Sequence, residues 1–369
     1  LSQMRDIFYR PRILTNHTLS LAGGTERYSN YTSLAYTGDR SSTPGDKNNS
    51  FKLNTRNDYT FSKWLKAYFI ADLTHQRTAS NRAVSPDNRF LPYQLFRDGE
   101  GNNIDMSYMG VMPYEAMDPI EKLTGRSLRY NPLSNATTGL STGNSLVARI
   151  TSGLTVNLYK GLRYEGVFGY VRGASRGTSY DDNTNYSRNI ELLRFAENNN
   201  GTVKYNLPNI GGRYGTSSIT DENWTVRNQL VYDYTSDNQL HQLNVLAGYE
   251  QQEQKSIRTG SVVYGYDQNA QSFTLLNYEI LAAQGVAGII PTMGGRARLE
   301  EPPFSESESL FRFRSYYGNL GYTYGKRYTL NASWRQDRSN LFGIDKSAQR
   351  KPAWSVGGKW ALSNETFMR

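Results

Sequence analysis

The sequence predicts an all-β protein, an antiparallel transmembrane β-barrel of which about eleven strands are visible. Three observations predict this fold: stretches that alternate apolar and polar residues, connections that are alternately short and longer, and aromatic residues beside the short turns. Side chains alternate faces along a strand, so each stretch has one apolar and one polar face. Brief turns on one side and large loops on the other are typical of outer-membrane barrels.

Composition excludes several other classes. The chain has 369 residues, of which 37% are hydrophobic and 13% aromatic, and its mean hydropathy is −0.67. No stretch approaches the ~18 consecutive apolar residues that a membrane-spanning helix needs, whereas a barrel strand needs an apolar residue only at every second position. The aromatic content argues against disorder.

Cofactors and nucleic acid are not expected. There is no cysteine, and the three histidines lie far apart, so the sequence offers no disulfide, thiolate site or metal-ligand spacing. The net charge of +9 would suit an anionic partner such as nucleic acid or lipopolysaccharide. Lysine and arginine are scattered without a dense basic run, however, so nucleic acid is not predicted as a partner.

The first four strands are expected in two hairpins. The glycines Gly23 and Gly24 are expected to supply the positive φ of the first tight turn. A medium loop through Pro44 then leads to the second hairpin, which turns near Ser62, and a loop of polar and turn-forming residues follows over 77–145. The four strands are predicted near 17–22, 28–36, 51–59 and 65–73.

The middle four strands form two further hairpins. The fifth strand alternates most clearly, with Leu146, Ile150 and Leu154 at one parity and Arg149 and Thr151 at the other. Short turns fall at 160–161 and 236–238, and long loops are expected over 173–222 and 257–309. The four strands are predicted near 146–158, 162–170, 224–234 and 243–249.

The last three strands are a hairpin and a single strand. The ninth ends at Tyr324, turns at Gly325, and returns as the tenth, which alternates over 328–337. A loop near 339–352 precedes the eleventh strand, which is expected over 354–362.

Aromatic residues bracket the short turns, as in the interfacial girdle of a membrane barrel. The alternative is that they pack across hairpins in a soluble β protein. The residues are Phe61, Trp64, Tyr159, Tyr164, Tyr232, Tyr234, Tyr322, Tyr324 and Tyr328.

The odd number of strands predicts that others are missing. Strands one and eleven would run in the same direction, whereas single-chain bacterial barrels have an even number of antiparallel strands. An open edge in lipid also leaves backbone groups unpaired. Eleven is half of twenty-two, so residues 1–369 are expected to form the N-terminal half of the wall of a 22-stranded plugged barrel. The polar start over 1–10 lacks a signal peptide and suggests that the sequence begins inside a longer protein.

Several segments resemble the barrel of SusC/RagA-type TonB-linked outer-membrane transporters. The resemblance is most specific over 314–360, in Arg-Ser-Tyr-Tyr-Gly-Asn-Leu-Gly-Tyr (314–322), Tyr-Thr-Leu-Asn-Ala-Ser-Trp-Arg-Gln-Asp (328–337), Ser-Asn-Leu-Phe-Gly (339–343) and Ala-Trp-Ser-Val-Gly-Gly-Lys-Trp (353–360). The segments 17–24 and 61–66 are similar to early barrel hairpins of this family. The family's signal peptide, TonB box, plug domain and C-terminal strands have no counterpart in the chain.

The resemblance implies energised import of a large nutrient, an oligosaccharide or a peptide, across the bacterial outer membrane. It also implies a SusD-like surface lipoprotein over the long loops, the TonB complex acting through the absent N-terminal part, and contacts with the remaining strands, the plug and outer-membrane lipid. Two alternatives stay open: a structural or adhesive barrel without transport, and a soluble carbohydrate-binding β protein.

The chemical motifs do not indicate an enzyme. The run from Asp98 to Asp105 lacks the Gly and Glu of a calcium-binding EF-hand and is expected to be a hairpin tip. The acidic run 305–308 is expected to be a solvated loop, and no nucleophile elbow, phosphate loop or HExxH motif is present. Polar residues of the predicted inward face are expected to pair with each other and with a plug, or to contact a solute: Arg149, Arg163, Glu165, Arg227, Asp233, Glu250, Arg335 and Asp337.

Overall fold

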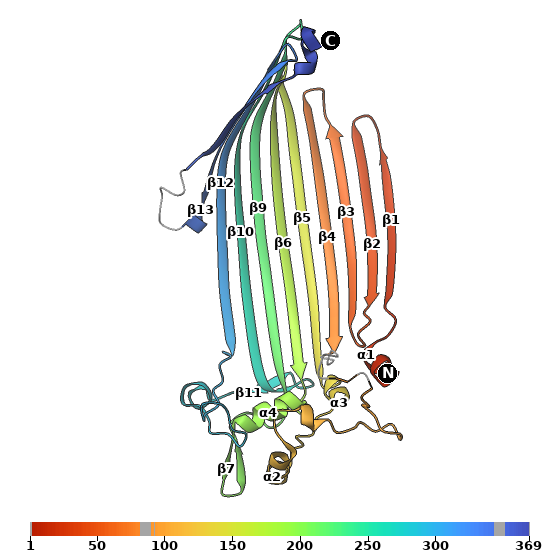
Figure 1. Cartoon of the computed structure of the whole chain (residues 1–369), viewed down its shortest axis with the longest axis vertical. Helices are drawn as coiled ribbons and strands as arrows, with labels where there is room; N and C mark the ends of the chain where they lie inside the picture. Colours follow the sequence, from red (N-terminus) through yellow and green to blue (C-terminus); the bar gives the residue numbers. More distant parts are fainter. Residues whose placement is uncertain (1, 82–89, 92, 343–350, 369) are drawn as a thin grey trace.

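The computed structural model describes residues 2–81, 90–91, 93–342 and 351–368. Its main feature is one antiparallel sheet in which eleven strands follow each other in chain order (Figure 1). This confirms the predicted strand number and sheet type. The strands are β1 (Ile13–Gly24), β2 (Tyr28–Arg40), β3 (Lys47–Thr60), β4 (Leu65–Asn81), β5 (Gly139–Tyr159), β6 (Leu162–Asp181), β9 (Gly212–Thr235), β10 (His241–Asp267), β12 (Phe304–Tyr324), β13 (Tyr328–Ser339) and β14 (Ala353–Trp360).

The α-helices gather at one end of the sheet, where the long connections lie (Figure 1). Two short strands there form a separate hairpin, and a third pairs with the end of β10. These elements are α1 (Ser2–Phe8), α2 (Tyr114–Thr124), α3 (Pro132–Ala136), α4 (Tyr186–Arg194), β7 (Ala196–Asn199), β8 (Thr202–Tyr205) and β11 (Ser272–Thr274). No helix in the described part of the chain is both long and apolar enough to cross a membrane.

The short turns all lie at the opposite end of the sheet (Figure 1). Gly161 and Gly325 have φ of +77° and +59°, which a residue without Cβ adopts without strain. The expectation for Gly23 and Gly24 was wrong, since both are strand residues with no positive φ. Gly24 is needed for close approach instead, because a Cβ there would lie 2.4 Å from the carbonyl oxygen of Tyr28.

The strands continue further towards the long loops than the sequence indicated. β10 runs to Asp267 although its alternation was visible only over 243–249. The acidic run 305–308 belongs to β12, so the expectation of a loop was wrong, although the run is exposed. Beyond the apolar band both faces of the strands carry polar residues, and alternation therefore gives no signal there.

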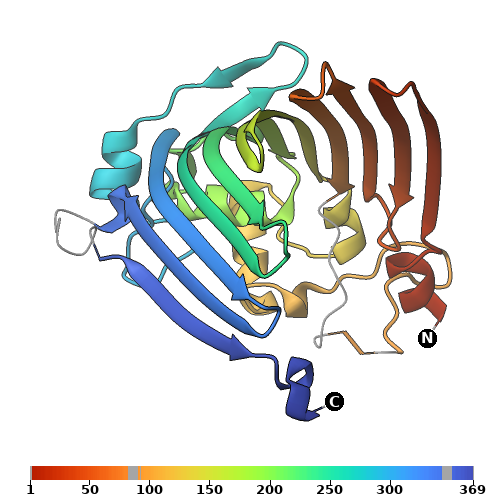
Figure 2. The same cartoon turned by 90° about the horizontal axis from the view of Figure 1, so that it is seen from above.

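The sheet is a single curved layer (Figure 2). The apolar side chains of β5 are not buried against a second sheet: Leu146, Ile150, Leu154 and Leu158 are between 37% and 54% exposed. Water would not tolerate such an extended apolar surface, whereas lipid would cover it. The exposure of these residues contradicts the alternative of a soluble sandwich.

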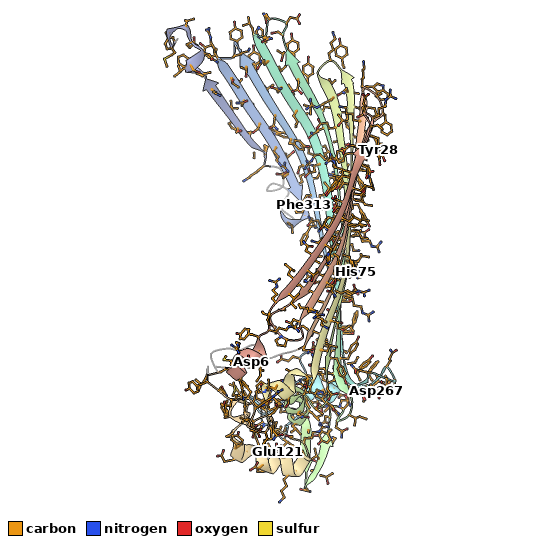
Figure 3. The ribbon with its side chains drawn as sticks, turned by 90° about the vertical axis from the view of Figure 1, so that its right-hand side faces the viewer. Asp6, Tyr28, His75, Glu121, Asp267 and Phe313 are labelled. Carbon is orange, nitrogen blue, oxygen red and sulfur yellow. The ribbon has the colours of Figure 1, made fainter. Side chains whose placement is uncertain are left out.

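The buried core lies in the connections at the long-loop end, below the strands in Figure 3. We call this packed assembly the loop cap. Its three clusters draw on α1 and the connections β4–β5, β6–β9 and β10–β12. The most completely buried members include Phe96, Met117, Leu128, Leu193 and Leu281.

Replacing Leu154 by Arg is expected to prevent stable insertion of the barrel. Leu154 lies on the apolar face of β5, midway between Ile150, the register partner of Tyr170, and Leu158 at the short turn, so a charge there would lie deep in hydrocarbon at a cost of about 2–4 kcal/mol. Heat-modifiable gel migration after refolding into lipid vesicles measures the folded fraction. The matched control is Thr155→Arg, one residue along and on the other face, which should fold normally; equal folding of both variants would contradict the assignment of faces.

Candidate functional site

The pairing register divides the sheet into two faces. On the polar face, Glu165 of β6 lies opposite Gln229 of β9, and Arg227 lies opposite Glu250 of β10. The loop cap covers the end of this face, because Tyr264 shares the parity of Glu250 on β10 and is buried in the cap. The cap helices lie within the curve of the sheet in Figure 2. The polar face is therefore the inner face of the curve.

The other face, the apolar face, carries a band bounded by two rows of aromatic residues. The row at the short turns was predicted, and its rings contact each other, as in the pairs Tyr28–Tyr59 at 5.0 Å and Tyr328–Trp360 at 6.2 Å between ring centroids. The second row lies towards the long loops and was not predicted. It includes the pairs Tyr36–Phe51 at 4.8 Å and Tyr249–Tyr316 at 5.1 Å, together with Tyr170, Trp224, Trp334 and Trp354.

The two rows mark the two boundaries of a hydrocarbon layer, since aromatic side chains concentrate where apolar and aqueous surroundings meet. Between the rows the apolar face carries mainly aliphatic residues, such as Ala67, Ala71 and Leu73 on β4. Each aromatic residue of the second row has the same parity as the apolar residues of its strand, and this signal was present in the sequence. Its members are spread over strands far apart in the chain, however, and only the sheet brings them to one level.

Polar side chains of β6, β9, β12 and β13 form one network on the polar face. Arg163 Nε donates to Glu165 Oε1 at 2.6 Å, and a second guanidinium nitrogen donates to Asp233. Gln229 Nε2 donates to Glu165 Oε2 at 2.6 Å and its Oε1 accepts from the Tyr317 hydroxyl at 3.1 Å. This places Arg163, Glu165 and Asp233, three of the residues named from the sequence, in direct contact.

The network continues to the last strands through Arg335. The Arg335 guanidinium stacks over the Tyr317 ring at 5.8 Å and donates to Asp337 at 2.8 Å and to the Ser315 hydroxyl at 3.1 Å. Tyr317 and Gln229 are thus the links between predicted residues. Sequence reasoning missed Tyr317, although its parity, opposite to that of Tyr316, places it on this face.

Three other residues complete the predicted set. Arg227 and Glu250 form a separate pair across β9 and β10, with Nε donating to Oε2 at 2.6 Å. Arg149 is exposed and has no ion pair with any described residue. Exposed ion pairs contribute about 0–1 kcal/mol each, so the network gives the inner wall a fixed pattern of charge more than it gives stability.

The loop cap is attached to the polar face through Tyr264. Its hydroxyl donates to Glu191 Oε1 of α4 at 2.9 Å, and the Arg188 guanidinium stacks on its ring at 4.8 Å. Arg188 also donates to Glu191 at 3.3 Å and to the Pro208 carbonyl at 3.1 Å. Burial lowers the pKa of Arg188, while Glu191 opposes this change. The buried arginine is thus fully engaged in holding α4 against β10.

The run from Asp98 to Asp105 is a hairpin tip, as expected. The Asp98 carboxylate accepts from the backbone N–H of Asn102 at 2.8 Å and of Glu100 at 3.0 Å, and these hydrogen bonds lower its pKa. Arg97 and Asn103 form an isolated β-bridge beside it. Among the residues that the structure describes, no group of three or more potential metal ligands comes together.

Comparison with known proteins identifies the sheet. TonB-dependent receptors P39 and P26 of Formosa agariphila are each 23% identical to the chain, over 95% and 99% of its length. Two structures of the RagAB peptide transporter superimpose with TM-scores of 0.64 and 0.66, at 16% and 17% identity and over 99% of the chain. The chain is thus similar in sequence to TonB-dependent receptors, and its sheet has the fold of part of the RagAB structure. No family model matches the sequence.

The likeness is to barrels of TonB-dependent receptors, which lie in the bacterial outer membrane. The chain spans 28% and 32% of the two receptors of Formosa agariphila and 36% of the RagAB chains. It corresponds to about a third of these TonB-dependent receptors.

Replacing Arg163 by Gln is expected to destabilise the barrel by about 1 kcal/mol, because it breaks two ion pairs at once. A double-mutant cycle with Glu165→Gln, followed by urea unfolding in vesicles, measures the coupling. Arg149→Gln is the control, since no ion pair is lost. A coupling of zero would show that the Arg163–Glu165 contact is not maintained.

Replacing Leu193 by Ala should loosen the loop cap without affecting the strands. Leu193 is fully buried in the cluster with Met117 and Ile190, where a cavity costs about 2–5 kcal/mol. Limited proteolysis of the receptor in detergent, compared with heat-modifiable migration, separates the cap from the barrel. Leu275→Ala is the control, because Leu275 is 87% exposed in the β10–β12 connection; unchanged proteolysis of L193A would contradict a packed cap.

Proposed function

We propose that the chain is part of the barrel of a TonB-dependent importer that takes up a large nutrient, an oligosaccharide or a peptide. The observation that carries the proposal is the polar inner wall enclosed by a lipid-compatible outer face, in a chain that is similar to TonB-dependent receptors. RagAB, whose barrel the sheet resembles, is a peptide transporter. For this chain we propose a substrate that is either an oligosaccharide or a peptide.

We further propose that residues 1–369 form the N-terminal half of the barrel wall. In the described chain, β1 and β14 each have a partner on one side only. In hydrocarbon every unpaired backbone group costs several kcal/mol, so additional strands are needed to close the sheet. A barrel of twenty-two strands leaves a wide lumen that a plug fills.

The inner wall provides the contacts that a plug or a passing solute needs. Arg149 has no ion pair within the described chain, and Arg227 and Asp337 are exposed on the same face. Such side chains hydrogen-bond to a polar surface without a large desolvation cost. We assign the eight residues named from the sequence to the lumen, where they contact the plug and each other.

The partners proposed are a SusD-like surface lipoprotein and the TonB complex. The lipoprotein is placed over the long-loop end, where the packed loop cap offers a rigid base. The complex of RagA with RagB in the neighbouring structures supports a two-component arrangement. TonB is proposed to act from the other side, through the part of the receptor that carries the TonB box.

The uptake proposal is tested by deleting the gene and measuring growth on defined nutrients. The deletion strain is expected to lose growth on one class, either peptides or an oligosaccharide, while growth on a monosaccharide or free amino acids is unchanged. Complementation with a receptor lacking its TonB box should fail to restore growth. Unimpaired uptake of both classes would instead favour the non-transporting structural or adhesive barrel.

A further inference from the structure

Arginines occupy the apolar face immediately beyond the second aromatic row. Going from the second row towards the long loops, Arg172 and Arg176 are the first and third apolar-face residues beyond Tyr170 on β6. On β12, Arg314 is the first apolar-face residue beyond Tyr316 in the same direction. His75 is the apolar-face residue of β4 next to Arg77, and Figure 3 shows it nearer the long-loop end of the sheet than Tyr28. At the opposite boundary, the apolar-face residues that end the strands are aromatic or aliphatic, among them Tyr59, Leu65, Leu158, Leu162, Tyr234, Leu243, Tyr324 and Tyr328.

One group of these arginines crosses three strands. Arg77 of β4 and Arg176 of β6 are both register partners of Asn144 on β5, so the three side chains form one row. Both arginines are exposed, and neither has an ion pair or hydrogen bond with a described residue. Arg172 lies opposite Glu222, whose carboxylate accepts from the Tyr170 hydroxyl at 2.6 Å. Further along this face, Glu308 pairs with Lys255 at 3.2 Å.

A second group places two like charges directly opposite each other. Arg314 of β12 and Arg338 of β13 are register partners, an arrangement that destabilises a sheet unless an anion lies between them. The neighbouring acid Glu253 is already paired with Arg312 at 2.6 Å. Arg338 stacks on Tyr316 at 6.0 Å, and its buried Nε has no hydrogen-bond partner in the described structure.

We propose that these two groups, Arg77 with Arg176 and Arg314 with Arg338, bind the phosphate groups of a phosphorylated glycolipid in the outer leaflet. The long loops of such barrels lie outside the cell, so this boundary of the band faces the headgroups of the outer leaflet. The planar guanidinium binds phosphate through paired hydrogen bonds, and Tyr316 holds Arg338 beside the band. The proposal rests on the membrane placement and on the barrel being completed as proposed above, but not on what is transported.

The test uses the full-length receptor in detergent and fluorescent diphosphoryl lipid A in the same micelles, with binding followed by anisotropy. The variant R77Q/R176Q/R314Q/R338Q is expected to bind at least about tenfold more weakly, since each lost contact is a charge-assisted hydrogen bond. Replacing the same four residues by Lys should restore only part of the affinity, because the charge remains but the paired hydrogen bonds of the guanidinium are lost. Wild-type binding to dephosphorylated lipid A should be weak.

The matched control removes four cations from the polar face, as K52Q/K66Q/R149Q/R258Q, with the same change in net charge. It should bind as the wild type does. Equal losses in both quadruple variants, or equal wild-type binding of phosphorylated and dephosphorylated lipid A, would overturn the proposal.

Folding of each variant is checked by heat-modifiable migration. If the first variant does not fold, R77Q/R176Q and R314Q/R338Q are measured separately, and each is expected to bind about threefold more weakly. A receptor without uptake activity would still bind the lipid, so failure of the transport proposal is distinguishable.

Discussion

The structure depends on one constraint, the need to pair every backbone N–H and C=O group inside a hydrocarbon layer. An antiparallel sheet satisfies it from strand to strand, and the pairing from β1 to β14 follows chain order without a crossover. Because the partners are backbone groups, the side chains are free to serve two different solvents. The alternation of Leu146, Ile150 and Leu154 with Arg149 and Thr151 is the consequence.

The same constraint determines where the core can lie. A sheet with lipid on one face and a wet lumen on the other has no apolar interior of its own. The buried hydrophobic residues are therefore found mainly in the loop cap, in clusters around Leu193, Leu281 and Phe96. The cap is joined to the strands by polar contacts, the hydroxyl of Tyr264 with Glu191 and the guanidinium of Arg188 with Pro208.

The polar side chains of the inner wall are hydrogen-bonded to each other and still remain accessible to water. Arg163, Glu165, Gln229, Tyr317 and Arg335 form a connected series across the strands, yet most of these side chains remain partly exposed. Charges in this setting keep much of their hydration, so their pairing is weak and exchangeable. A surface of this kind holds a plug in place without binding it irreversibly, which suits the proposed import mechanism.

The sequence by itself determined the strand number, the two faces and the side of the short turns, because apolar alternation is a local pattern with a period of two. It named Arg163, Glu165 and Asp233 but not their contacts, which depend on the register between β6 and β9. Only the tertiary structure decided the length of β10 beyond the band, the second aromatic row, the packed loop cap and the opposition of Arg314 and Arg338. Each of these joins residues far apart in the chain, and backbone pairing, which no local pattern encodes, brings them together.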